Sequence, residues 1–283
     1  MAKTRWKPFP YADKAYEYAG TRLKAHLSRL HQGDREPYPA LAELRKLLEL
    51  CPEFAPPGSL EQAAAELEDA WRAYHRGDFG RAVELGIAVG PLGYGVANKA
   101  ANIYATYLET SESAKLALFL QTAERAESVF SRAKPVVNAW YFHAQALGRY
   151  SQGISVLKAL EKGLGGKVRS SLEQAVRLEP RHADAHIAMG TYHAEIINKV
   201  GAILGGLTYG ASRDEAVKHF ETALKLNPHS AIARVEYANG LAMMFGEAKL
   251  ARATSLYKEA AVCPAADAME RFDAELAKSE LED

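Results

Sequence analysis

Apolar residues recur along most of this chain at spacings of three and four, the period that places them on one face of an α-helix. Residues 11–31 show it through Tyr16, Leu23 and Leu27, and residues 41–50 repeat it with leucines. Later helical runs are expected from residue 60 and at 97–109, 113–133, 167–178, 231–244 and 248–262. Val and Ile rarely alternate with polar residues, so no strand is expected. The pattern therefore predicts an all-α fold.

Proline and glycine mark the ends of these runs. Residues 52–59 (PEFAPPGS) contain three prolines and a glycine, which preclude a helix and indicate a joint. Directly after them, Ser59 and Gln62 form a capping box that predicts a helix start. We therefore expect residues 1–57 to form an N-terminal helical extension, 58–264 a set of helical repeats, and 265–283 a capping helix, all in one continuous solenoid.

An internal repeat supports this organisation. Residues 170–190 are followed 48 residues later by residues 218–238, with small and apolar side chains at corresponding positions. The matched pairs are Leu172 with Phe220, Ala175 with Ala223, Leu178 with Leu226, Pro180 with Pro228, Ala183 with Ala231, Ala185 with Ala233, and Gly190 with Ala238. Proline cannot continue the helix before it, so each copy reads as helix, turn and helix. Repeats of this kind indicate stacked supersecondary units.

The pattern resembles the tetratricopeptide repeat (TPR) family, which places small residues where two helices touch and proline at the turn. The matching residues are Leu172, Ala175, Pro180, Gly190 and Tyr192, then Ala216, Phe220, Ala223, Pro228, Tyr237 and Ala238, with Ala70, Tyr74, Gly77, Asp78, Phe79 and Ala82 in an earlier unit. The family repeat is about 34 residues long. The longer spacing here therefore places an insertion, residues 197–212, between the two helices of a unit. The resemblance implies a solenoid of roughly five units.

A narrower resemblance concerns the segment that contains this insertion. It is similar to the TPR-type T-component of TRAP transporters, through Leu204, Gly205, Gly206, Ala216, His219, Phe220, Ala223 and Leu224. That resemblance implies a ligand-binding, oligomeric accessory component of a transport system. Long-linker TPR units also occur in regulator-of-microtubule-dynamics-like proteins, so both relatives stay open.

Composition limits the choice of partner. The 35 basic and 35 acidic side chains give no electrostatic reason to expect nucleic acid or anionic lipid as the main partner. Cys51 and Cys263 are too few for a disulfide framework. No signal-peptide segment and no run of 18 apolar residues is found, so we expect a cytoplasmic protein without a membrane span.

Catalytic, metal and cofactor motifs are not supported by the sequence. His182, His186 and His193 share a helical face and could bind zinc or nickel, but these positions also fit packing and the turn of the motif. The glycines before Lys167 resemble a phosphate loop, but Val168 stands where Ser or Thr should bind magnesium. We expect no catalytic residue, metal or cofactor, and an enzyme with an unrecognised site ranks last.

The TPR resemblance implies that the first helix of each unit lines a concave groove. The groove positions are Trp71, Tyr74, His75, Asn138, Tyr141, Phe142, Gln145, Arg149, Thr191, Glu195, Glu236 and Asn239. Aromatic rings bury area while amides and Arg read polar groups, so this set suits capture of a protein segment. The resemblance therefore predicts an interaction scaffold or adaptor. In the alternative interpretation, Tyr141 and Phe142 pack against an insertion helix.

Two apolar, glycine-rich segments stand apart from the helices. Residues 200–209 (VGAILGGLTY) and 85–97 are expected to be loops of similar character. An exposed apolar loop is a liability, so we expect each to pack on its own stack. Self-association into a homo-oligomer and contact with a lipid-like ligand are the alternatives.

Overall fold

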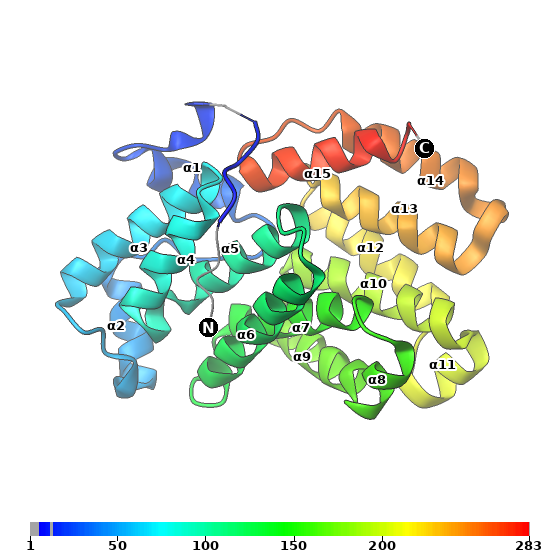
Figure 1. Cartoon of the computed structure of the whole chain (residues 1–283), viewed down its shortest axis with the longest axis horizontal. Helices are drawn as coiled ribbons and strands as arrows, with labels where there is room; N and C mark the ends of the chain where they lie inside the picture. Colours follow the sequence, from blue (N-terminus) through cyan, green and yellow to red (C-terminus); the bar gives the residue numbers. More distant parts are fainter. Residues whose placement is uncertain (1–5, 12–13, 283) are drawn as a thin grey trace. The chain divides into compact units, whose positions relative to one another are not determined.

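The computed structural model describes residues 6–11 and 14–282, and within these ranges it contains helices and turns but no strand (Figure 1). The predicted all-α class is confirmed. Contacts divide the chain into two compact units. Unit 1 holds Glu36–Gly153 with the described residues up to His31, and unit 2 holds Gln32–Arg35 with the described residues from Ile154 onward.

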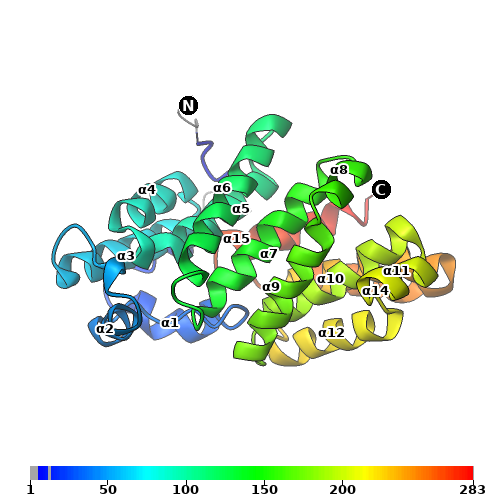
Figure 2. The same ribbon diagram turned by 90° about the horizontal axis from the view of Figure 1, so that it is seen from below.

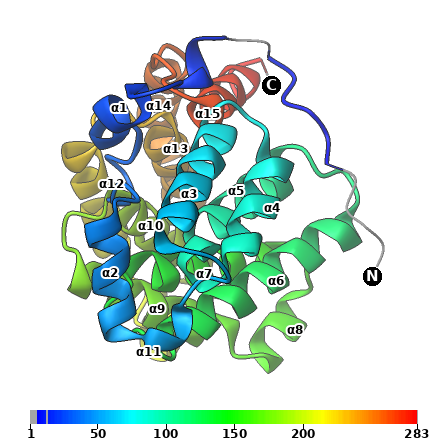
Figure 3. The ribbon, with the colours of Figure 1, turned by 90° about the vertical axis from the view of Figure 1, so that its left-hand side faces the viewer.

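Unit 1 is built from antiparallel helix pairs preceded by short helices. Its elements are η1 (Lys14–Glu17), α1 (Arg22–Leu30), α2 (Leu41–Leu50), η2 (Pro52–Phe54), α3 (Leu60–His75), α4 (Phe79–Val89), η3 (Pro91–Gly93), α5 (Tyr94–Tyr107), α6 (Glu112–Phe130) and α7 (Val137–Gln152). Helix α3 packs on α4 and α5 on α6, while α2 lies beside α3 (Figure 3). The predicted helix start at Ser59 is confirmed, because its hydroxyl accepts from the Gln62 amide at 3.1 Å. The Gln62 side chain donates to Glu66 at 2.8 Å, so the second half of the predicted capping box is not formed.

Unit 2 repeats this construction. Its elements are α8 (Val156–Glu161), α9 (Leu164–Leu178), α10 (Ala183–Val200), α11 (Ala202–Tyr209), α12 (Arg213–Leu226), α13 (Ala231–Phe245), η4 (Gly246–Lys249), α14 (Leu250–Ala261) and α15 (Ala268–Ser279). Helices α10 and α12 lie side by side (Figure 2), and α13 pairs with α14. Helix α15 packs on both members of the last pair.

Small residues set the distance between paired helices in unit 2. A Cβ atom on Gly190 would lie 2.7 Å from the ring of Phe220, closer than carbon atoms can approach. Ala223 and Ala238 have no exposed surface. The Phe220 ring stacks on Tyr237 with centroids 5.1 Å apart and fills the remaining space. The repeated small positions therefore do what the sequence predicts.

Three expected elements differ from the structure. The helix expected over residues 11–31 is broken, because Tyr18 and Gly20 adopt positive φ angles of 39° and 57° between η1 and α1. The loop expected at 85–97 is short, because α4 continues to Val89 and α5 already begins at Tyr94. The insertion 197–212 also contains a helix of its own, α11.

Candidate protein-binding site

The predicted aromatic positions of α3 are buried beneath the N-terminal extension. Trp71, Tyr74 and His75 are at most 2% exposed. The His31 ring meets the edge of Trp71 at 4.5 Å between centroids and also packs on His75 at 5.1 Å. Tyr18 covers His75 from another direction, at 5.9 Å. These aromatic groups therefore hold the extension on the repeats.

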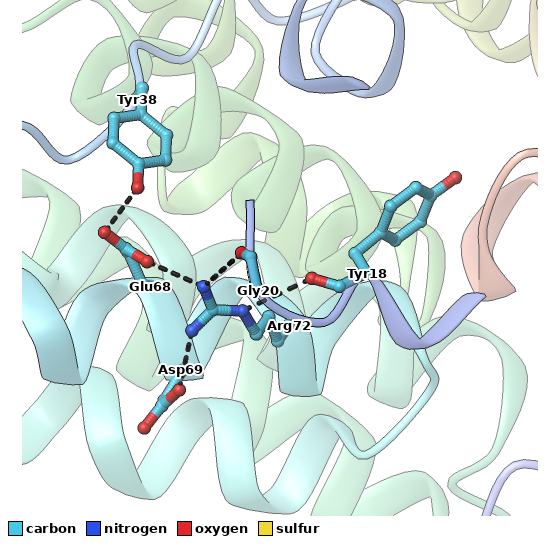
Figure 4. A network of polar contacts seen from close by, with 6 residues as sticks. All are labelled: Tyr18, Gly20, Tyr38, Glu68, Asp69 and Arg72. Atoms are coloured by element: carbon cyan, nitrogen blue, oxygen red, sulfur yellow. Dashed lines mark hydrogen bonds and ion pairs between the residues drawn. The ribbon is translucent and has the colours of Figure 1, made fainter. Parts of the chain in front are cut away.

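A single arginine ties the extension to α3 (Figure 4). The Arg72 guanidinium donates to the carbonyl oxygens of Tyr18 at 3.3 Å and Gly20 at 3.0 Å, and to the Glu68 carboxylate at 2.7 Å. Tyr38 donates its hydroxyl proton to the other Glu68 oxygen. Burial and the neighbouring Glu68 raise the pKa of Tyr38 to about 12. The residues on both sides of α1 are thus fixed to one helix.

The predicted α7 positions Asn138 and Phe142 also meet the extension. The Asn138 amide donates to the Glu36 carboxylate. Both residues line a cavity of about 60 Å³, together with Glu36, Leu47 and Phe54 from the extension. Ligand pockets usually measure roughly 300–1,000 Å³, so this space suits a water molecule or two rather than a small-molecule ligand. This face of unit 1 therefore holds a segment of the chain itself.

Helix α5 adds polar residues that the sequence did not reveal. The Asn98 side chain lines the same cavity and accepts from the Arg125 guanidinium at 2.9 Å. Asn102 donates to the predicted groove residue Gln145 at 2.8 Å. Burial lowers the pKa of Arg125. Asn98 and Asn102 lie one helical turn apart. Aligning residues 94–107 with the first helix of the repeat would therefore have placed both on the same face.

The remaining α7 positions differ in accessibility. Tyr141 is buried and packs against the Phe142 ring, at 5.3 Å between centroids. Gln145 and Arg149 are half-buried, one turn apart, toward the end of the helix. Arg149 donates to Gln152 at 3.2 Å. Substitution of these two residues removes little core packing.

The four predicted positions of unit 2 lie on α10 and α13, which pack together. Thr191 donates to the Glu236 carboxylate at 3.0 Å. Glu195 pairs with Lys199 at 3.0 Å, and Asn239 accepts from the Tyr257 hydroxyl. Glu236 is buried, and the other three are half-buried. Thr191, Glu236 and Asn239 therefore join neighbouring helices of the unit, whereas Glu195 pairs within α10.

The histidines of unit 2 form a cluster different from the predicted one. His182 is the N-cap of α10, where its Nδ1 accepts from the Ala185 amide at 3.0 Å. His186 instead meets His219 of α12, with the two Nδ1 atoms 2.8 Å apart. His193 accepts from the Ser212 amide at 3.3 Å. No group of three or more His, Cys, Asp or Glu side chains is arranged for a metal ion within the described ranges. None of the helices so described is long and apolar enough to cross a membrane.

Paired helices with small residues at their contacts, repeated and closed by a final helix, define a TPR-type helical repeat fold. A comparison with solved structures agrees. The crystal structure of a thermophilic TPR protein from Thermus thermophilus matches with a TM-score of 0.55 and 19% sequence identity. The match covers 77% of this chain and 99% of that one. No protein-family model matches the sequence, and no curated protein does.

Because the sequence identity is only 19%, the match is evidence for the fold alone. The predicted resemblance to TPR proteins is confirmed at that level, while the narrower resemblance to a transporter T-component stays a prediction. The three-part domain division, the cytoplasmic location and self-association also stay predictions.

Proposed function

We propose that this protein is a non-enzymatic scaffold or adaptor that binds a segment of a partner protein on the inner faces of its helical repeats. TPR-type folds suggest such a role, because their stacked helices present extended surfaces. The aromatic, amide and arginine side chains of these faces suit peptide recognition.

One observation carries the proposal most directly. Within residues 36–54 of the chain, Glu36 accepts from Asn138 of α7, and Leu47 and Phe54 share a cavity lining with Phe142. A polar anchor with two apolar side chains is the pattern expected of a bound peptide. A face that holds one segment of chain in this way has the chemistry to hold another.

Gln145 and Arg149 are the positions to test, because they are half-buried and extend beyond the part of α7 that Glu36 contacts. Truncation of a buried residue such as Phe142 would confuse the result, since Phe→Ala in a core costs ~3–5 kcal/mol. A photo-crosslinking amino acid at position 145 should capture a partner, whereas the same group at the exposed Lys218 should not.

Capture should be lost in the double variant Gln145→Ala/Arg149→Ala and retained in Lys218→Ala. Circular dichroism melts of each variant establish that the repeats remain folded. Equal recovery of every partner by the double variant would remove the proposed binding face.

A further inference from the structure

Two short helices of unit 2, α8 and the α11 helix of the insertion 197–212, carry an unusual concentration of exposed apolar side chains. Val156, Leu157 and Leu160 on α8 are 45%, 67% and 45% exposed, and Ile203, Leu204 and Leu207 on α11 are 83%, 55% and 84% exposed. These six are among thirteen large apolar residues exposed in the described chain. Two short helices therefore hold nearly half of them. We refer to these six residues as the apolar tip.

Both helices lie at one edge of unit 2, toward the lower side in Figures 1 and 3. The contacts agree with this view. The Tyr209 ring at the end of α11 packs against Gly165, and the Tyr209 carbonyl accepts from Arg169 at 2.9 Å. Both partners belong to α9, which begins three residues after α8 ends. The apolar tip thus consists of two apolar patches at this edge, one on α8 and one on α11, and Figure 2 shows the two helices apart from each other.

The stack itself does not cover these side chains. Helix α8 has no buried residue, and α11 buries only Gly205. Arg169 and Tyr192 hold α11 in place through the Tyr209 backbone, at 2.9 and 3.1 Å, rather than through its apolar side chains. Helix α11 is therefore positioned by polar contacts at its end, and the apolar side chains of both helices are left largely exposed. Soluble proteins seldom leave such a group of residues exposed without a binding role.

The charges beside the apolar tip are mostly positive. Lys158, Lys162 and Lys167 are exposed and have no ion-pair partner in the described structure. Glu161 is the one acidic residue in 154–169, and 197–212 contains none. The zero net charge of the chain therefore conceals a local basic surface. Lysines beside exposed leucine and isoleucine are typical of surfaces that rest on anionic bilayers.

We propose that the apolar tip is a membrane-contact site, at which α8 and α11 insert their apolar side chains into the interface of an anionic phospholipid bilayer while the lysines contact its headgroups. Helix α11 has eight residues and a length of about 12 Å, which suits a helix lying in the interface. A second copy of the chain fits less well, because a stable interface buries about 800 Å² and 20–30 residues per partner. The site shares no residue with the proposed protein-binding faces, so either proposal can fail alone.

The test is co-sedimentation with phosphatidylcholine vesicles that contain phosphatidylserine at roughly one part in three. The wild-type protein should sediment with these vesicles, be released by salt, and bind pure phosphatidylcholine far less. Ile203→Ser/Leu207→Ser should weaken binding about tenfold or more. Val262→Ser is the matched control, because Val262 is 80% exposed elsewhere in unit 2 and should leave binding unchanged.

A second variant, Lys158→Gln/Lys162→Gln, removes charge without touching an apolar side chain and should weaken binding to the anionic vesicles alone. Circular dichroism reports folding of each variant, and light scattering reports its mass. The proposal is overturned if the wild type ignores anionic vesicles or binds neutral ones equally well. It is also overturned if the wild type is a dimer that Ile203→Ser/Leu207→Ser converts to a monomer, since a second copy then covers the apolar tip.

Discussion

Two segments of similar composition, 85–97 in unit 1 and 200–209 in unit 2, differ in how far their apolar side chains are buried. Both are apolar and rich in glycine. In the first, Val89, Val96 and Ala97 are buried, so packing on its own stack is confirmed. In the second, Ile203 and Leu207 are more than four-fifths exposed, so the same expectation is wrong.

The glycines explain the difference. A Cβ on Gly93 would lie 2.2 Å from the Gly86 carbonyl oxygen, so these two glycines let α4 and α5 touch backbone to backbone. In the other segment, Gly201 and Gly210 have φ angles of +81° and +61° and lie at the two ends of α11. One pair of glycines brings helices together, and the other pair starts and stops a helix. Composition alone cannot distinguish these uses.

The largest effect expected from this comparison is that of Gly93→Ala. The new methyl group would meet backbone rather than a movable side chain, so we expect a loss of ~2–3 kcal/mol or more. Gly206→Ala is the matched change in α11, where the nearest atom lies at 3.6 Å and alanine favours the helix by up to ~1 kcal/mol. Urea denaturation followed by circular dichroism measures both, and equal stabilities would contradict the difference in packing.

Acid should destabilise α10 and α12, the helices before and after the exposed segment. Burial lowers the pKa values of His186 and His193, and burial with both of these neighbours lowers that of His219 to about 4. Unfolded histidine titrates near 6.5, so the unfolded state binds protons first as pH falls. The stability that these neutral histidines contribute is therefore fully present above pH 6.5 and is lost progressively as the pH falls from about 6.5 to 4. Protonation of both His186 and His219 would also place two donors face to face.

Denaturation midpoints across this range, with hydrogen exchange to localise the change, provide the measurement. Exchange in α10 and α12 should accelerate in acid. His219→Gln should make the pH dependence of stability shallower, because it removes the group with the most strongly lowered pKa. An unchanged slope in this variant would show that other groups control acid unfolding.

A smaller effect is expected where α11 is anchored. Arg169→Met removes the donor to the Tyr209 carbonyl and leaves Tyr192 as the remaining one, at a cost of ~1 kcal/mol. Hydrogen exchange of residues 200–210 should rise while that of α13 stays constant. Arg177→Met, on the exposed side of the same α9 helix, should change neither. Uniform acceleration across unit 2 would instead assign Arg169 a global role.

The smallest effect on stability is expected for Ile203→Ser. An exposed position away from structural contacts changes stability by less than about 0.5 kcal/mol. Val96→Ala in the buried segment, although the gentler substitution, should cost on the order of 2 kcal/mol because Val96 is 1% exposed. Thermal melts of the two variants compare the segments directly. A large loss for Ile203→Ser would mean that the residue is covered in solution.

Much of the helical plan could be predicted from local signals. Residues 41–50 and the Ser59 cap match α2 and the start of α3, since proline, capping residues and apolar spacing act within a few positions. The break at Tyr18 and Gly20 was missed, because Arg72 binds both of their carbonyl oxygens from far along the chain. Distant contacts of this kind leave no periodic trace.

The candidate site likewise has positions that the repeat pattern predicts and contacts that it does not. Repeat matching placed Asn138 and Phe142 on an inner face, but nothing local to them indicates that Glu36, Leu47 and Phe54 would lie against it. The sequence indicates His219 only through its match to a motif, because its pairing with His186 depends on how α10 and α12 are aligned.

The sequence by itself therefore determined that the chain is helical, where most helices begin and end, and which small residues bring paired helices together, because these follow from interactions over a few residues or from repetition. Only the tertiary structure decided that the N-terminal extension packs against Trp71 of α3 and against Asn138 and Phe142 of α7. It also decided that, of two alike glycine-rich segments, 85–97 packs mostly on its own stack, whereas 200–209 leaves Ile203, Leu204 and Leu207 exposed. Burial depends on which surfaces meet, and that requires the positions of residues far apart in the chain.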